Sequence, residues 1–453
     1  MLNNQHIEII KSTIPLLESA GPALTQHFYQ RMFSHNPELK DIFNMTHQKT
    51  GRQSVALFEA VAAYAKNIEN LAALTTAVER IAHKHTSFNI KAEHYQIVGH
   101  HLIETLRELA PDAFTQPVEE AWTEAYLFLA QIFIDREEEL YQLREKALGG
   151  WRGTRRFVVA EKTPESELVT SFVLQPEDGG KVLGYEVGQY LGIQVKPTNS
   201  EHVEIRQYSL SQAPTGSNYR ISVKRELSDS HDNGLVSNYL HDSVNVGDVI
   251  DVMPPAGDFF YKETDKPVVL ISAGVGCTPM QAILQKLSQD DKTETVTYLH
   301  ACEHEQQHSF VDEVATIVSA KGWNQQVWYR EPKQTENESA KGLMDLSAMK
   351  ETLPVHFGEF YICGPIAFMD AMVQQLDALD VDALAFTTKY LVRTRTYKSL
   401  IKPLFKPPLP TGRRWFFSFK FAVALIVTLG KLSSNFIYAQ PTSGLSVSLV
   451  CMA

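Results

Sequence analysis

The hydrophobic periodicity of this chain changes twice, and these two changes constrain its fold more than any other feature. Up to residue 148 apolar residues recur at helical spacing, most clearly in "SVALFEAVAAYAKNIENLAAL" and "AWTEAYLFLAQIFIDREEELYQL". After Gly149-Gly150-Trp151 the period becomes two, in short segments such as "RRFVVAEKTP" and "YRISVKRE". After Phe260 strand and helix patterns alternate, beginning with "PVVLISAG" and "PMQAILQKLSQ".

These patterns predict a multidomain protein with three domains of different class. Residues 1–148 are predicted to form an all-α domain. Residues 151–260, with turn residues between short strands, favour an antiparallel β-barrel. Residues 261–386 favour an α/β domain with a doubly wound parallel sheet, because strands there alternate with helices.

Charge and cysteine content narrow the functional classes. The segment from Thr387 to Ala453 holds ten of the 42 Lys and Arg residues and no Asp or Glu. The rest of the chain therefore has 32 basic against 53 acidic residues, a net charge of about −21, which argues against a nucleic-acid-binding surface. Four cysteines without paired spacing indicate a reducing compartment and no zinc site. The N-terminal "MLNNQHIEII" has no export signal, so we expect a cytoplasmic protein that does not bind membranes.

A first motif, "RQYSLS" from Arg206 to Ser211, lies on a predicted strand of the barrel. A guanidinium group can pair with a diphosphate, an aromatic ring can stack on a flavin, and a hydroxyl can reach a flavin nitrogen. Alone, the motif fits a solvated strand equally well.

Two glycine-containing turns follow in the third domain. In "ISAGVGCTPM", Gly274 and Gly276 follow a buried strand and open a helix, where backbone N–H groups can approach a pyrophosphate. A plain strand–helix turn would look similar. In "YICGPIAFM" a Gly-Pro turn ends another strand, at the sheet edge where such folds bind ligands.

Together, R-x-Y-S, G-x-G-x-T-P and C-G-P in this order resemble the ferredoxin reductase-like flavoproteins over residues 152–386. The resemblance implies an FAD site near Tyr190 that is formed by Arg206, Gln207, Tyr208 and Ser209, with a phosphate-facing turn at Gly234, Val236 and Ser237. It implies an NAD(P)H site formed by Gly274, Val275, Gly276, Cys277, Thr278, Pro279, Cys363, Gly364 and Pro365. Cys363 fits a small core residue equally well.

A helical domain joined to a flavin reductase needs an electron acceptor. The stretch "IAHKHTSFNI" offers His83 and His85, but residues two apart do not share a helix face, so at most one points inward. With "HFYQRMFSHNPELKDIFNM" before it and "HYQIVGHHL" after it, the chain resembles the flavohaemoglobins from Met1 to about Phe386.

That resemblance implies a haem site. His85 would be the proximal iron ligand, with Tyr95 and Glu137 as its hydrogen-bonding partners. The distal pocket would consist of Tyr29, Gln53 and Leu57. Phe43 would contact the porphyrin, and Lys84 would guide electrons from flavin to haem. A carboxylate behind the histidine increases electron density at iron and favours O–O activation over storage. Considered alone, Tyr29, Phe43 and Leu57 also fit plain helical core.

The implied function is an NAD(P)H-dependent nitric oxide dioxygenase, monomeric, with haem b, FAD and NAD(P)H as cofactors and NO and O₂ as partners. NAD(P)H would give hydride to FAD, FAD would pass single electrons to haem, and NO and O₂ would become nitrate. One alternative is a haem-based gas sensor or carrier that its own reductase keeps ferrous. Another is a flavin reductase whose helical domain is a docking module without haem.

The family pattern stops at Phe386. Flavohaemoglobins end with a strand and a short F-G-P segment whose aromatic ring lies against the flavin. From Phe386 onward, a shifted reading frame would take the last base of each codon together with the first two bases of the next codon. The codons that can encode this chain allow the shifted frame to encode HYEVFGPHAHL followed by a stop. We therefore predict a one-base frameshift after Phe386, which makes residues 387–453 a tail without evolved function. Altered hydride transfer and poor solubility should follow.

Overall fold

The computed structural model describes residues 2–43, 52–228, 233–290, 292, 294–334 and 340–390. The chain divides into a compact unit, residues 1–397, and a second unit, residues 398–453, which lies outside the described residues together with most of the predicted tail. Within the described ranges no helix combines the length and apolar character that a membrane span requires.

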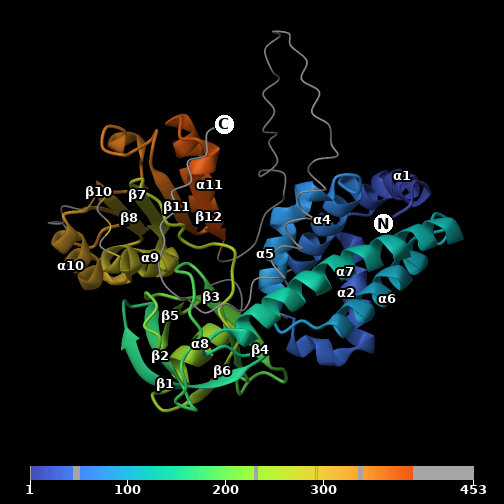
Figure 1. Cartoon of the computed structure of the whole chain (residues 1–453), viewed down its shortest axis with the longest axis horizontal. Helices are drawn as coiled ribbons and strands as arrows, with labels where there is room; N and C mark the ends of the chain where they lie inside the picture. The colour runs from blue at the N-terminus through green and yellow to red at the C-terminus, as the bar shows by residue number, and fades with distance from the viewer. Residues whose placement is uncertain are drawn as a thin grey trace, which may run out of the picture. The chain divides into compact units, whose positions relative to one another are not determined.

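The N-terminal domain is helical (Figure 1). Its α-helices are α1 (Asn4–Ala20), α2 (Pro22–His35), α4 (Arg52–Lys66), α5 (Thr75–Thr86), α6 (Ala92–Leu109) and α7 (Gln116–Lys146), with 3₁₀ turns η1 (Pro37–Asp41) and η2 (Leu71–Leu74). Asn3 caps α1 by accepting a hydrogen bond from the His6 N–H. Prolines lie in the first turn of α2 and of α7, where a missing N–H costs little. The core contains Phe28, Met32, Tyr64 and Trp122.

The second domain is an antiparallel sheet with one helix. Its elements are β1 (Arg155–Pro164), β2 (Val169–Pro176), β3 (Tyr190–Val195), β4 (Glu204–Ser209), β5 (Tyr219–Lys224), α8 (Leu235–Asp242) and β6 (Val249–Val252). The strand order is β4-β3-β6-β1-β2-β5. An antiparallel bridge between Leu210 and Ile221 joins the end of β4 to β5, so the two outer strands meet as the predicted barrel requires.

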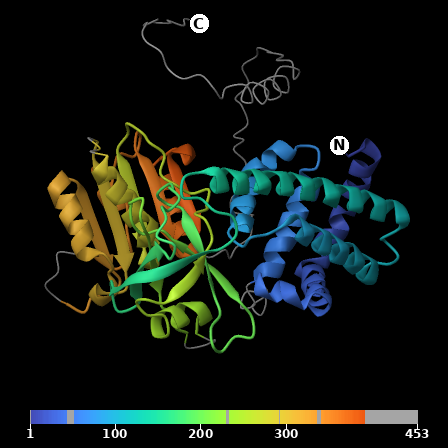
Figure 2. The same cartoon turned by 60° about the horizontal axis from the view of Figure 1, so that its bottom comes forward.

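The third domain is a parallel sheet with helices on both faces, as Figures 1 and 2 show. Its strands are β7 (Val268–Ala273), β8 (Val296–Cys302), β9 (Asn324–Tyr329), β10 (Ala340–Lys341), β11 (Glu359–Gly364) and β12 (Phe386–Tyr390), in the order β10-β9-β8-β7-β11-β12. Its helices are α9 (Cys277–Gln289), α10 (Val311–Lys321) and α11 (Ile366–Ala378), with 3₁₀ turns η3 (Gly274–Gly276), η4 (Glu305–Gln307), η5 (Ser347–Met349) and η6 (Ala383–Ala385).

Both faces of the parallel sheet are buried, which explains the continuous apolar runs in its strands. Val268 and Leu270 belong to one core cluster, which also holds residues of α9, whereas Val269 and Ile271 belong to another, which holds residues of α11. The edge strand β12 contains Thr387 to Tyr390, the first four residues of the predicted tail, and pairs in parallel with β11.

Candidate functional site

His85 lies in the last turn of α5 and meets two other helices there. Its Nδ1 atom is 2.8 Å from Oε1 of Glu137 on α7 and 2.9 Å from the hydroxyl of Tyr95 on α6. The Tyr95 hydroxyl donates to the same Glu137 oxygen at 2.5 Å. Glu137 is only 3% exposed, so the carboxylate faces His85 and Tyr95 rather than water. The three residues predicted for the proximal side therefore form one hydrogen-bonded cluster.

This cluster fixes the state of the imidazole. A carboxylate accepts hydrogen bonds, so it holds the proton on Nδ1 and leaves the lone pair on Nε2 for a metal. Burial raises the pKa of Tyr95, and the Glu137 carboxylate raises it further, so the tyrosine stays a neutral donor. This donor set fits haem iron, which takes one neutral histidine nitrogen.

His83 points elsewhere, as the helical spacing predicted. Its Nδ1 accepts hydrogen bonds from the Gly257 N–H at 3.0 Å and from Arg144 at 3.1 Å, so Nε2 donates to Glu79. Burial lowers the pKa of His83, with the Arg144 guanidinium as a further cause. His83 thus makes contacts outside the cluster around His85.

The predicted distal residues also come together. Tyr29 on α2 is 6% exposed, and its ring centroid lies 5.9 Å from that of Phe43. Leu57 on α4 packs against the same core cluster. Burial raises the pKa of Tyr29, which keeps its hydroxyl protonated. These contacts fit both a distal pocket and a plain core. Gln53 lies on α4, but its side chain is outside the described residues.

The predicted flavin motif lies on two paired strands. Tyr190 of β3 is opposite Ser209 of β4, and Leu191 is opposite Tyr208. The Ser209 hydroxyl is buried and has no hydrogen-bond partner among the described residues. A buried hydroxyl without a partner is costly, so it fits a bound group that carries a polar atom at this point. Burial raises the pKa of both Tyr190 and Tyr208, so both remain neutral.

Two other residues of the motif already have protein partners. Arg206 forms an ion pair with Glu204 at 2.9 Å and donates to the Ile205 carbonyl. Gln207 donates through Nε2 to the Ser87 hydroxyl at 2.7 Å. A diphosphate at Arg206 would therefore share the guanidinium with Glu204.

The turn at Gly234 begins α8. The Ser237 hydroxyl donates to the Gly234 carbonyl and accepts from the Glu226 N–H, both at 3.2 Å, while Val236 is buried. Because the hydroxyl holds the turn itself, the backbone N–H groups at the start of α8 are the natural donors to a phosphate.

The predicted nucleotide turns meet at the end of the parallel sheet. Gly274 has a φ of +51°, which favours glycine. A Cβ on Gly276 would lie 2.2 Å from the Cys363 carbonyl oxygen, so only glycine lets the turn after β7 approach the end of β11. Gly364 and Pro365 follow at that end, where Pro365 is the N-cap residue of α11. Val275, Cys277, Thr278 and Pro279 complete the turn after β7, with the Thr278 hydroxyl donating to the Val275 carbonyl at 2.9 Å.

Cys363 is fully buried between these turns, and burial raises the pKa of its thiol to about 12. A thiol in this state is a weak nucleophile. The sequence left two roles open for Cys363, and these surroundings fit the role of a small core residue. Cys363 nevertheless lies next to the predicted nucleotide site.

The sequence did not reveal how the helix of His85 contacts the second domain. Ser87 and His83 bind Gln207 and Gly257, and Arg80 forms an ion pair with Asp258 at 3.0 Å. Ser87 lies in the same "HKHTSF" stretch as His85 and was the available signal. Lys84, which directly precedes His85, is exposed. Predicted haem and flavin residues are therefore linked through the last turn of α5 and its C-cap residue Ser87.

Arg144, near the end of α7, was also missed. It is buried and donates to the Thr86 hydroxyl at 2.6 Å as well as to His83. Burial lowers the pKa of Arg144 to about 10. This cation fixes the last turn of α5 from the side of α7.

Comparison with known proteins finds a family for each of the three domains. The globin family matches residues 26–132, the oxidoreductase FAD-binding domain matches residues 156–261, and the oxidoreductase NAD-binding domain matches residues 270–374. Among solved structures, the FAD/NAD-binding domain of a nitric oxide dioxygenase from Vibrio cholerae O1 biovar El Tor is 53% identical, with a TM-score of 0.51 over 52% of this chain and 98% of that one.

Two further relatives cover nearly the whole predicted globin–reductase segment. A flavohemoglobin from Malassezia yamatoensis, solved with FAD and haem bound, has the same fold, with a TM-score of 0.76 and 24% identity over 86% of this chain and 99% of that one. The flavohemoprotein of Vibrio cholerae serotype O1 is 67% identical over 382 residues, which are 84% of this chain and 96% of that protein. The chain therefore belongs to the flavohaemoglobin (flavohemoprotein) family.

Proposed function

We propose that this protein is an NAD(P)H-dependent nitric oxide dioxygenase that removes NO by converting it to nitrate. The observation that carries the proposal is the linkage of two networks through α5: His85 binds Glu137 and Tyr95, and Ser87, two residues later, binds Gln207 of the flavin motif. The Vibrio domain with 53% identity is described as part of a nitric oxide dioxygenase, which supports the same activity here.

The residues fit three cofactors. When bound, haem b would supply an iron that binds O₂, FAD would accept a hydride and release single electrons, and NAD(P)H would supply the hydride. We assign haem to His85, FAD to the strands that carry Tyr190 and Ser209, and the nucleotide to the turns at Gly274 and Cys363. Glu137 and Tyr95 hold the proton of His85 on Nδ1. The buried Tyr29 hydroxyl would orient a diatomic ligand by donating a hydrogen bond.

The electron balance of the reaction agrees with these roles of haem, FAD and NAD(P)H. Oxidation of NO to nitrate releases three electrons and reduction of O₂ takes four, so each NO needs one electron from the protein. One hydride supplies two electrons, so one NAD(P)H serves two NO and two O₂ molecules and releases a proton. A reductase on the same chain as the globin domain can provide this continuous supply.

We also propose that the protein acts as a monomer in the cytoplasm. The thiols of Cys277, Cys302 and Cys363 are not engaged in disulfides, and a reducing compartment keeps cysteines in this state.

The test is NADH consumption by purified, haem-supplied protein. We expect steady consumption only when NO and O₂ are both present, with two nitrate ions formed per NADH. A sensor or carrier would show one rapid reduction and then no NO-dependent consumption. A docking module without haem would show no Soret band. Either result would overturn the proposal.

A further inference from the structure

A lysine is buried where the third domain meets the second. Lys389 lies on the edge strand β12 and is 7% exposed. Its Nζ donates to the Gly188 carbonyl at 2.6 Å and lies 5.7 Å from the ring centroids of both Tyr190 and Phe259. An ammonium between a carbonyl oxygen and two aromatic faces occupies a favourable cation site.

Among the described residues, no carboxylate forms an ion pair with Lys389 alone. Asp258, the carboxylate that acts on Lys389 electrostatically, is itself bound by Arg80 at 3.0 Å. Burying an ammonium without close charge pairing is expensive, and burial accordingly lowers the pKa of Lys389 to about 8. The carbonyl and the two rings must therefore carry most of the compensation.

The position of this cation connects two predicted sites. Lys389 is in register with Cys363 on β11, directly before the Gly364-Pro365 turn. Its ring partner Tyr190 is the residue expected beside the flavin, and Gly188 precedes it by two positions in the same domain. The lysine thus joins the strand next to the nucleotide turn to the loop and strand next to the flavin.

Neighbouring contacts on the same face of the sheet reinforce this junction. The ring of Tyr361 on β11 lies 6.0 Å from Phe259 and 5.9 Å from Tyr261, and its hydroxyl accepts from the Lys262 N–H. Tyr361, Cys363 and Lys389 therefore face the second domain together, and Lys389 is the member at the outer strand.

We propose that Lys389 is a positioning residue for hydride transfer, which clamps the last strand of the nucleotide-binding sheet to the flavin-binding barrel through Gly188, Tyr190 and Phe259. The proposal rests on the proposed function only in that FAD and NAD(P)H bind at these two sites. It assigns a structural role to a residue of the predicted tail, whatever the origin of that tail.

Three variants of the full chain test the clamp. Lys389→Met keeps the length of the side chain and removes the charge, Lys389→Arg keeps a cation, and Lys341→Met removes an exposed lysine from β10 at the opposite edge of the same sheet. The first readout is the rate of FAD reduction by NADH without O₂ or NO, so haem chemistry does not contribute. The second is hydrogen exchange of residues 386–390 and 187–190 in protein without cofactors.

We expect Lys389→Met to slow FAD reduction about tenfold, which corresponds to about 1.4 kcal/mol, at unchanged FAD content, and to speed exchange in both segments. Lys389→Arg should recover most of both effects, and Lys341→Met should match wild type. Wild-type behaviour of Lys389→Met, a loss that arginine does not rescue, or an equal loss in Lys341→Met would overturn the clamp.

If Lys389→Met fails to fold, Phe259→Leu removes one aromatic face and should give a smaller change in the same direction; no change would overturn the clamp. NO-dependent NADH consumption is measured separately, so failure of the dioxygenase proposal leaves the result on FAD reduction intact. The exchange measurement needs no bound cofactor at all.

Discussion

Oε1 of Glu137 accepts from Nδ1 of His85 at 2.8 Å, across 52 positions of sequence and between α7 and α5. The same oxygen accepts from the Tyr95 hydroxyl, so a single buried carboxylate oxygen sets the tautomer of the histidine and the orientation of the tyrosine. This hydrogen bonding is what we expect of a histidine that binds iron, and it underlies the proposed role of His85.

Glu137→Gln tests the charge at this point. The amide keeps the size of the side chain, but it can no longer place a negative charge behind His85. We expect NO-dependent NADH consumption to fall roughly 10–100-fold, as for other residues that support metal ligands, and the haem reduction potential to rise. Glu138→Gln, one position later and more exposed, is the control. An unchanged potential in Glu137→Gln would contradict the electronic role.

His85→Ala tests the iron ligand. We expect loss of stable haem binding, measured by the Soret band, with FAD content and NADH-driven dye reduction retained, because the flavin and nucleotide residues lie in other domains. His83→Ala is the control, since His83 bonds to Gly257, Arg144 and Glu79 rather than to Glu137. A normal Soret band in His85→Ala, or its loss in His83→Ala, would refute the assignment.

Tyr29→Phe tests the distal hydroxyl. The ring contacts with Phe33 and Phe43 should survive, since they involve the aromatic faces and edges alone. One hydrogen bond to a polarised ligand contributes roughly 1.5–3 kcal/mol, so O₂ should dissociate about 10–100-fold faster. Stopped-flow measurement of the O₂ off-rate gives the answer, and an unchanged rate would leave Tyr29 as a core residue only.

The fold was largely predictable because its signals are local. The change of period after Gly149 and again after Phe260 reports which residues face a core, and three classes of domain follow from it. The turn at Gly276 was also predictable from the sequence, since a glycine between a buried strand and a helix usually marks a turn. These features depend on neighbours within a few residues.

The junctions between domains could not be predicted in the same way. Gln207 and Ser87 are 120 positions apart, and Lys389 and Gly188 are 201 positions apart. Their contacts depend on strand register and on the packing of whole domains, which no local pattern encodes. Lys389 was further obscured because the family pattern stops at Phe386, although β12 continues to Tyr390.

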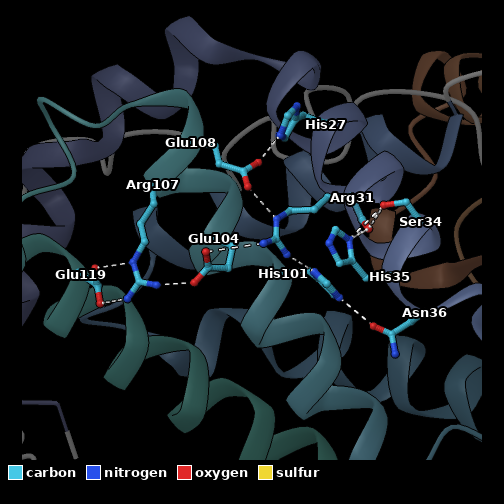
Figure 3. Close-up of polar contacts among 10 residues, drawn as sticks. All are labelled: His27, Arg31, Ser34, His35, Asn36, His101, Glu104, Arg107, Glu108 and Glu119. Carbon is cyan, nitrogen blue, oxygen red and sulfur yellow. Dashed lines mark hydrogen bonds and ion pairs between the residues drawn. The ribbon is translucent and has the colours of Figure 1, made fainter.

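His101 in the helical domain, whose contacts Figure 3 shows, should make the stability of the fold sensitive to acid. His101 on α6 is 2% exposed, with Arg31 donating to Nδ1 at 2.5 Å and Nε2 lying 2.8 Å from Oδ1 of Asn36. Arginine can only donate, so His101 is neutral with its proton on Nε2. Burial lowers the pKa of His101, and the Arg31 guanidinium and the neighbouring His100 and His35 lower it further, against Glu104.

Because the folded pKa lies below the unfolded value of 6.5, the unfolded chain binds more protons as the pH falls below 6.5. The free energy of unfolding should therefore decrease in this range. His101→Gln can accept a hydrogen bond from Arg31 and donate one to Asn36 without titrating. Between pH 7 and pH 5.5, its free energy of unfolding, measured in urea, should therefore fall less than that of wild type. Equal losses would show that His101 does not contribute.

Lys389 predicts an effect of alkaline pH on hydride transfer that is opposite in sign to its effect on folding. The pKa of Lys389 is about 8 in the folded chain against an ordinary 10.5, so the ammonium is lost above pH 8 and the clamp weakens. Among the groups that face it, burial raises the pKa values of Cys363 and Tyr190, so neither loses its proton before Lys389 does. The Asp258 carboxylate is paired with Arg80.

Between pH 8 and 10.5 the unfolded chain binds more protons than the folded one, so this lysine makes the free energy of unfolding rise with pH. FAD reduction by NADH should nevertheless slow over the same range, because the cation that holds β12 to Tyr190 and Phe259 disappears. Lys389→Arg stays charged and should keep its rate across the range. The test is the rate of FAD reduction by NADH, measured for wild type and for Lys389→Arg from pH 7 to pH 9.5. A wild-type rate that falls no more steeply than that of Lys389→Arg would exclude the ammonium as the clamp.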